Sequence, residues 1–344
     1  MRAKLEDICE RGTSSLMQKD IEGNTGDYSI YGASGLLGHV DFYHQACPYV
    51  AVVKDGAGIG RTMFLPAKSS VIGTMQYLLP RANVLPKYLY YVVSYMRLAK
   101  YYTGATIPHI YFKDYKNEEF TLHSMEAQKT IVDVLGKIEK IIENRQNEIE
   151  YLDTLIKAQF VEMFGDPIDN RPGWRTEPLE NLCSVIVDCP HSTPSYTLED
   201  TGFMCIRTSI VKKNRIIWDE IEYIPEDEYY QRIQRKKPEK GDVIYTREGA
   251  ILGIAAVIDR DCNVALGQRS MLLTPDQAKV TPEFLSVAMN FDSFLEKALK
   301  GVAGSASPHI NVGDIKAFDM IVPPIDQQRA FSGLIWQIDK SKVV

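Results

Sequence analysis

The most regular pattern of apolar and polar positions in the chain runs from residue 125 to residue 164. Apolar side chains recur there in steps that mostly alternate between four and three residues, which is typical of a helix that packs along a second helix. Ser124 is a candidate N-cap, and Gly165-Asp166-Pro167 predicts the end of a helix that would be about 60 Å long. The predicted packing seam consists of Ile131, Leu135, Ile138, Ile142, Ile149, Leu152, Ile156 and Met163.

Matching segments flank this helix. They are LEDIC (5–9) with LENLC (179–183), KDGA (54–57) with REGA (247–250), GATIPHI (104–110) with GSASPHI (304–310), and Gln128 with Gln328. The matches follow the same order in both copies, which indicates an internal repeat of one unit. A single apolar stripe would also fit a helix that lies on the core of its own domain, but the repeat favours a spacer between two bodies.

Each copy contains the same series of predicted elements. Short apolar runs such as residues 49–53 and 243–246 predict strands that end at glycine-rich turns, and a helix, a short strand and a long helix follow. The sequence therefore predicts an α+β protein with two repeated globular α/β domains in a pseudo-two-fold arrangement. In the register of the repeat, the second long helix is truncated by about twenty residues. The expected segments are a first domain (1–124), a central helix (125–166), a second domain (167–322) and the start of the second helix (323–344).

Composition and charge narrow the class of protein. The 344 residues allow two cores, and 45% hydrophobic and 24% charged residues are ordinary for a soluble globular protein. No apolar run is long enough to span a membrane and no signal-peptide pattern opens the chain, so we expect a cytoplasmic protein. The six cysteines form no C-x-x-C pair, which argues against a metal site. A net charge of −6 argues against nonspecific coating of nucleic acid, although a local basic patch would suffice to bind phosphates.

Several motifs resemble those of specificity subunits of type I restriction-modification systems. One type of target recognition domain in that family is similar to YGASGLLGHVD (31–41), VVKDGAGIGR (52–61) and IGTMQYLLP (72–80). A second type is similar to GDVIYTREGAILGIAAVI (241–258), ALGQRSMLLTP (265–275) and VPPIDQQRA (322–330). Residues 143–167 resemble the central conserved region of the family, so the resemblance covers essentially the whole chain.

The resemblance implies a DNA-reading subunit without catalytic activity. Each target recognition domain would read one half of a split, non-palindromic target in double-stranded DNA, and the coiled-coil-type helices would set the spacer length. The helices would also dock two modification (methyltransferase) subunits, and restriction subunits would join to cleave. S-adenosylmethionine, ATP and Mg would be bound by those partners, with no cofactor in this chain. Because the second helix is shortened, a homodimer or a partner fragment would complete the helix pair.

A search for an active site finds no motif of an enzyme. The chain has no N-P-P-[YF] methyltransferase motif and no phosphate-binding loop. Residues 56–60, GAGIG, lack the spacing of a dinucleotide fingerprint and predict a turn with a close backbone approach. His109 and His309 recur in both copies, where a structural role at the junction of domain and helix is favoured over a DNA contact. The alternative function is an adaptor that dimerises through its helices and binds protein partners with its two globular domains.

Candidate DNA contacts follow from the chemistry of base and phosphate recognition. Arg pairs with guanine, Asn or Gln pairs with adenine, and Lys or backbone amides suit phosphates. The candidates in the first domain are Tyr28, Tyr31, Ser34, His39, Lys54 and Arg61. Those in the second are His191, Ser192, Thr193, Arg207, Lys212, Lys213, Arg215, Arg247, Gln268 and Arg269. A solvated surface side chain is the alternative for each of them. Because the two sets differ, we expect the two half-sites to differ in sequence.

Overall fold

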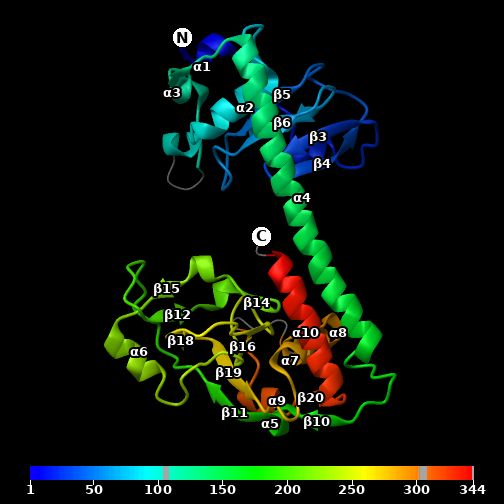
Figure 1. Cartoon of the computed structure of the whole chain (residues 1–344). Coiled ribbons are helices and arrows are strands. Elements are labelled where there is room, and N and C mark those ends of the chain that lie inside the picture. Colours follow the sequence, from blue (N-terminus) through cyan, green and yellow to red (C-terminus); the bar gives the residue numbers. More distant parts are fainter. Residues whose placement is uncertain (104–107, 301, 303–307, 343–344) are drawn as a thin grey trace. The chain divides into compact units, whose positions relative to one another are not determined.

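The computed structural model of the protein describes all residues except 104–107, 301, 303–307 and 343–344 (Figure 1). The chain forms two compact units, residues 1–145 and 146–344. The boundary between them lies within helix α4, Met125–Phe164, which is one continuous helix over the range that the apolar pattern predicts. Ser124 caps it as expected, because its side-chain oxygen accepts a hydrogen bond from the Ala127 amide at 3.3 Å.

The first unit contains two main sheets, and short strands and helices surround them. Its elements are β1 (Arg2–Lys4), α1 (Leu5–Ile8), β2 (Cys9–Thr13), η1 (Gln18–Asp20), β3 (Tyr28–Gly32), β4 (Gly35–Val40), β5 (Tyr49–Val53), β6 (Thr62–Leu65), β7 (Ser70–Val71), β8 (Met75–Pro80), α2 (Pro86–Tyr95), η2 (Leu98–Tyr101), α3 (Phe112–Tyr115) and β9 (Glu119–Thr121). The sheets have the strand orders β2-β8-β5-β6 and β4-β3-β7, and β1 pairs with β9.

The second unit repeats this order with added elements. Its elements are β10 (Thr176–Pro178), α5 (Leu179–Leu182), β11 (Cys183–Asp188), β12 (Met204–Ile206), η3 (Thr208–Ile210), β13 (Val211–Lys212), β14 (Arg215–Ile216), η4 (Trp218–Glu220), β15 (Glu222–Tyr223), α6 (Glu226–Arg232), β16 (Val243–Thr246), β17 (Ala255–Val257), β18 (Val264–Leu266), β19 (Ser270–Pro275), α7 (Pro282–Met289), α8 (Asp292–Ala298), α9 (Val312–Lys316), β20 (Asp319–Ile321) and α10 (Ile325–Lys342).

The sheet topology confirms the internal repeat. The second unit has the orders β11-β19-β16-β17 and β15-β12-β18, and β10 pairs with β20. In both three-stranded sheets the central strand pairs antiparallel with one neighbour and parallel with the other. The LEDIC and LENLC segments form the same short helix, and the first strand of the four-stranded sheet follows directly in each unit. The predicted fold of two repeated α/β bodies with a long helix between them is therefore confirmed.

The repeated PHI segment is hydrogen-bonded to the turn that follows β5 in the first unit and β16 in the second. The Gly56 amide donates to the Pro108 carbonyl at 3.0 Å, and the Gly249 amide donates to Pro308 at 3.1 Å. Both glycines have φ near +90°, a conformation that glycine adopts without steric cost. The predicted close approach at residues 56–60 is also confirmed, since a Cβ on Gly60 would lie 2.4 Å from the Ala99 amide nitrogen.

A buried glutamine fixes the start of each long helix. Gln128 and Gln328 are fully buried. Gln128 accepts a hydrogen bond from the Leu85 amide at 2.9 Å and donates to the carbonyls of Asn83 and His123, both at 3.0 Å. Gln328 makes the same three bonds in the second unit, with the Thr281 amide and the carbonyls of Lys279 and Pro323, at 3.1, 3.1 and 2.8 Å. Each side chain thus satisfies three backbone groups and ties a long helix to the loop before α2 or α7.

In the second unit, α10 runs antiparallel to the C-terminal part of α4 (Figure 1). Phe331 of α10 contacts Phe164 of α4, with 5.5 Å between ring centroids, and Lys342 pairs with Asp153 at 2.7 Å. Because the later residue of α10 meets the earlier residue of α4, the helices point in opposite directions. Phe160, fully buried, is the centre of this core and contacts the rings of Phe164, Phe284, Phe291 and Phe331.

The predicted seam of α4 is covered at its two ends but not in between. Ile131 packs on the core of the first unit, and Leu152, Ile156 and Met163 pack on the core of the second. Leu135 and Ile149 are half-buried. Ile138 and Ile142, in contrast, are 46% and 63% exposed. Val134 (50% exposed) and Ile141 (66%) lie on the same helical face, so α4 presents an uncovered apolar stripe. We refer to Val134, Ile138, Ile141 and Ile142 as the α4 stripe.

Candidate nucleic-acid interface

Three segments of the second unit meet at one edge of the sheet β11-β19-β16-β17. Asp188, at the end of β11, pairs with Met271, and Thr246, at the end of β16, pairs with Ser270. The loop after β11, the turn after β16 and the residues before β19 therefore lie side by side. We call this the second-unit edge: residues 188–193, 247–249 and 267–269.

Arg247 is the electrostatic centre of the second-unit edge. It is only 6% exposed, and two of its nitrogens donate to the two carboxylate oxygens of Asp188 at 2.7 and 2.8 Å. Burial by itself lowers the pKa of Arg247. The hydrogen bonds and charge of Asp188, together with the charge of Glu248, outweigh this effect and raise the pKa above its usual value. His191 approaches the same Asp188 carboxylate at 3.2 Å. Because such a bidentate pair is strong and shielded from water, Arg247 holds the loops of this edge together.

The second sheet brings further candidates to the same place. β12 and β18 run parallel, and the Gly267 amide donates to the Ile206 carbonyl at 2.9 Å, so Arg207 lies beside Gly267, the residue before Gln268. Gln268 donates to the Thr193 hydroxyl at 3.1 Å. Arg207 lies over the Tyr196 ring and pairs with Glu222 at 2.5 Å, and this hydrogen bond raises the pKa of the Arg207 guanidinium. Gly267 is required there, because a Cβ would lie 2.6 Å from the Tyr196 hydroxyl.

The structure divides the second-unit candidates into two groups. Those in the second-unit edge, or beside it in the case of Arg207, are His191, Ser192, Thr193, Arg207, Arg247, Gln268 and Arg269. Lys212, Lys213 and Arg215 belong instead to the β13–β14 hairpin. Lys213 pairs there with Asp292 of α8 at 3.2 Å, and Asn214 bonds to Ser286 and Asn290 at α7. The hairpin is therefore held against the helices and not against the edge loops.

The first unit builds the equivalent edge. The Lys54 amide donates to the Thr74 carbonyl at 3.0 Å, as the Arg247 amide does to Arg269 in the second unit. Arg61 donates to the Ala33 carbonyl at 2.9 Å, which brings the β3–β4 turn and Ser34 to this edge. Tyr31 joins them, because its carbonyl accepts from the Ile72 amide. Four candidates, Tyr31, Ser34, Lys54 and Arg61, are thus grouped as the first-unit edge.

Tyr28 and His39 lie at the opposite end of the β3–β4 hairpin. His39 pairs with Ser29 in the strand register, and Tyr28 contacts the ring of Tyr43, with centroids 4.8 Å apart. At about 3.3 Å per residue, Tyr28 is roughly 10 Å along the strand from Tyr31. These two candidates are therefore not grouped with the other four.

His109 lies where the PHI segment crosses the first-unit edge. Its Nδ1 is 2.7 Å from the Asp55 carboxylate, which Lys54 also contacts. Burial alone would raise the pKa of Asp55, but the hydrogen bonds from Lys54 and His109 lower it below its usual value. The contact with Asp55 holds His109 where the PHI segment meets the turn after β5. Residues 104–107 and 303–307 of the two repeated motifs lie outside the described residues.

Sequence reasoning missed several residues at these edges. Ser14 and Ser15 follow β2 in the first unit, where the His191 loop follows β11 in the second, and Thr74 occupies the position of Arg269. Arg232 is buried beneath the second-unit edge, where it pairs with Glu228 at 2.9 Å and donates to the Ser192 carbonyl. Transferring each candidate through the repeat register would have identified Thr74. No sequence signal marks Arg232 as buried.

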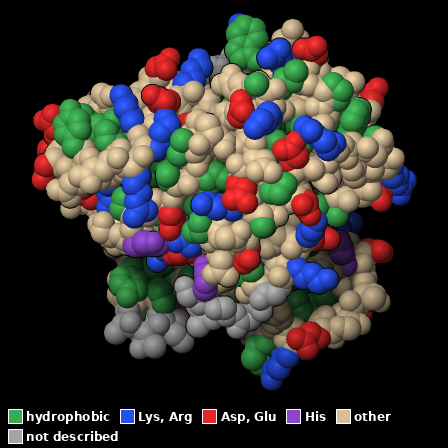
Figure 2. Space-filling model, turned by 90° about the horizontal axis from the view of Figure 1, so that it is seen from below, with side chains coloured by type: hydrophobic (Ala, Val, Ile, Leu, Met, Phe, Trp, Pro, Cys, Tyr) green, Lys and Arg blue, Asp and Glu red, His purple; other side chains and the backbone are tan. Residues whose placement is uncertain are grey.

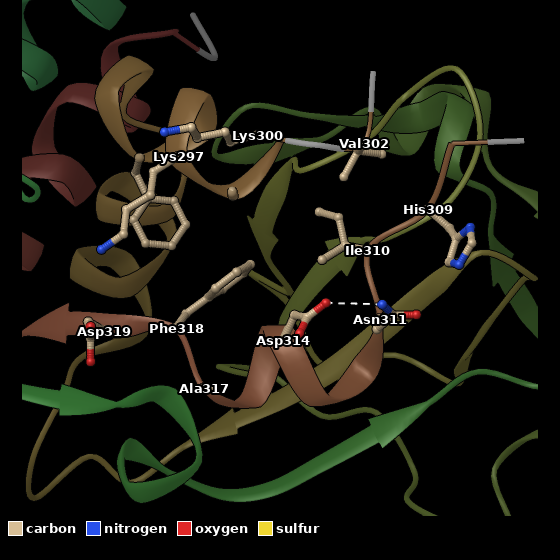
Figure 3. Close-up of a pocket in the computed structure, with 12 residues that line it drawn as sticks. Lys297, Lys300, Val302, His309, Ile310, Asn311, Asp314, Ala317, Phe318 and Asp319 are labelled. Atoms are coloured by element: carbon tan, nitrogen blue, oxygen red, sulfur yellow. Dashed lines mark hydrogen bonds between the residues drawn. The ribbon is translucent and has the colours of Figure 1, made fainter. Parts of the chain in front are cut away.

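A cavity of about 500 Å³ lies elsewhere in the second unit, between α8, α9 and β20 (Figure 3). Phe318 and Ile310 line it, together with Lys297 and Lys300, and Asn311 donates to Asp314 at 3.0 Å on one wall. The corresponding region of the first unit holds Phe112 and Tyr115, whose rings pack edge to face. Val312 and Ile315 stand at these positions in the second unit.

Charges of both signs are mixed over the surface. On the face in Figure 2, Lys and Arg side chains alternate with Asp and Glu, in keeping with the net charge of −6. Among the residues that the structure describes, no three His, Cys, Asp or Glu side chains are placed to hold one metal ion. Across the same ranges, no helix has both the length and the apolar character that crossing a membrane requires.

Comparison with known proteins finds similarity to one family. Residues 1–151 match the model of the type I restriction modification DNA specificity domain. The chain is 22% identical over 307 residues to the type I restriction enzyme MjaVIII specificity subunit of Methanocaldococcus jannaschii, covering 84% of this chain and 72% of that protein. It is 21% identical to the MjaIX specificity subunit of the same organism over 279 residues, which are 75% of this chain and 63% of that protein. Over its first 151 residues the chain matches this DNA specificity domain, and over most of its length it is similar to type I restriction enzyme specificity subunits.

The fold of this chain agrees with a solved structure. The crystal structure of the type I restriction-modification S subunit from M. genitalium superposes with a TM-score of 0.62 at 15% identity, covering 99% of this chain and 90% of the other. The role of the family is DNA sequence specificity. An adaptor function without DNA is consequently not favoured for this chain.

Proposed function

We propose that this specificity subunit reads a split, non-palindromic DNA target, one half with each unit. The observation that carries the proposal is that the same sheet edge recurs in both units with different side chains. The second-unit edge presents Arg269, Gln268 and Thr193, whereas the first-unit edge presents Arg61 and Ser34. Different donors and acceptors select different bases, so the two half-sites differ.

Modification subunits dock on the α4 stripe in this proposal. Four large apolar side chains on one helical face are exposed, and soluble proteins leave such a stripe uncovered mainly where a partner binds. Two modification subunits would supply methyl transfer with S-adenosylmethionine, and restriction subunits would add cleavage with ATP and Mg. The chain itself would act in the cytoplasm as a non-catalytic subunit, and a second copy of it is a further candidate partner for the helices.

Selection from random duplex DNA tests this function. The chain is mixed with the modification subunit of its own system and S-adenosylmethionine, and the methylated DNA pool is sequenced. We expect two unlike half-sites separated by a gap of fixed length, because one continuous helix joins the two reading units. The same mixture without this chain is the control. Methylation that is equally frequent at all sequences, despite a stable complex, would contradict the proposal.

A further inference from the structure

The arginines in, beside and beneath the second-unit edge differ in the groups that they bind. Arg207 pairs with Glu222, Arg232 with Glu228, and Arg247 with Asp188 and Glu248. Arg269 is exposed and, within the described part of the chain, pairs with no carboxylate. Arg235 also has no carboxylate partner among the described residues, but its Nη1 donates to the Asp188 carbonyl at 3.2 Å. The fork of donors on Arg269 is not used by any acidic side chain of the described residues.

The backbone of Arg269 is held in an unfavourable conformation. Its φ is +73°, a left-handed value that a side chain with a Cβ rarely adopts. The Arg247 amide donates to the Arg269 carbonyl at 3.0 Å and holds the residue there. The side chain passes over Gly249, where an added Cβ would lie 3.4 Å from Nη1 and 3.5 Å from Cδ of Arg269. These are ordinary van der Waals distances, so the Arg269 side chain lies in contact with the turn at Gly249.

The repeat shows that the fold itself does not require this strain. Thr74 occupies the same position in the first unit, and its carbonyl accepts the same backbone hydrogen bond, from Lys54. Thr74 is not among the described residues with positive φ. Because only one of the two copies is strained, we infer that the strained backbone positions the Arg269 side chain. Backbone strain of this kind is concentrated at functional sites.

We propose that Arg269 reads a guanine in the half-site of the second unit. A guanidinium with a free fork can donate to both O6 and N7 of guanine in the major groove, a pattern that no other base presents. Arg269 is exposed and lies beside Gln268 and Thr193 in the second-unit edge, which has an equivalent in the first unit. Its guanidinium therefore lies on the proposed DNA-binding surface. The inference rests on the proposed function and adds one specificity-determining residue to it.

The test is the DNA selection repeated with Arg269→Gly and Arg269→Lys. For Arg269→Gly we expect preference for guanine at one position of one half-site to fall by about 10- to 100-fold, while the other half-site and the gap stay unchanged. The same variant should unfold at a higher temperature, because glycine adopts φ +73° without steric cost. Arg269→Lys keeps the charge but loses the fork, so guanine preference should fall with it too.

Arg97→Gly is the matched control. Arg97 is also exposed and left-handed, with φ +50°, but it lies in the first unit after α2. Its glycine variant should gain thermal stability with no change at the second half-site. An unchanged motif for Arg269→Gly would overturn the inference. So would equal weakening at all sequences together with full rescue by lysine, the signature of a phosphate contact. If the unmodified chain selects no split motif, the proposed function fails instead.

Discussion

Replacing Gln328 by Ala is expected to lower the free energy of unfolding of the second unit by about 3 to 9 kcal/mol. The side chain is fully buried and satisfies the Thr281 amide and the carbonyls of Lys279 and Pro323. Each buried backbone group left without a partner costs about 1 to 3 kcal/mol. Gln128→Ala should have an effect of the same size in the first unit, because its three hydrogen bonds are equivalent.

Urea unfolding followed by hydrogen exchange of each unit measures this effect. The exchange readout matters because it reports separately on residues 1–145 and 146–344. Gln328→Met is the control for packing, since methionine fills a similar volume but makes none of the three hydrogen bonds. The methionine variant should be nearly as unstable as the alanine variant. A methionine variant as stable as the unmodified chain would show that packing alone, and not hydrogen bonding, holds the helix start.

The double substitution Ile138→Glu and Ile141→Glu is expected to weaken binding of the modification subunit by about 100- to 1,000-fold. Each side chain is a large apolar group on the α4 stripe, 46% and 66% exposed. A buried hot-spot residue typically contributes 2 kcal/mol or more to an interface, and burying a carboxylate there adds a desolvation penalty. The helix should persist, because glutamate is a good helix former at exposed positions.

Pull-down and sedimentation of the mixed subunits check this prediction, with circular dichroism to confirm that α4 remains helical. Leu198→Glu is the matched control, since Leu198 is 84% exposed and does not belong to α4. It should bind the modification subunit as the unmodified chain does. Assembly at full affinity by the double variant would show that the partner uses another surface.

The sequence by itself determined the local elements and the repeat. Helix α4 has the predicted bounds because the three-and-four spacing, the Ser124 cap and the Gly165-Asp166-Pro167 end are all encoded within a few residues of where they act. The repeat was visible because glycines with positive φ and buried glutamines tolerate few replacements, so Gly56 and Gly249, or Gln128 and Gln328, keep their identity when the loops between them change.

The tertiary structure decided which of the candidate side chains are available. The sequence ranks Arg207, Arg247 and Arg269 equally, but the carboxylates of Glu222 and Asp188, distant along the chain, neutralise the first two. The apolar pattern gives the whole seam of α4, but only packing shows that Leu152 and Ile156 are covered while Ile138 and Ile142 are not. Periodicity and caps depend on neighbouring residues, whereas ion pairing and burial depend on contacts that exist only after the chain has folded.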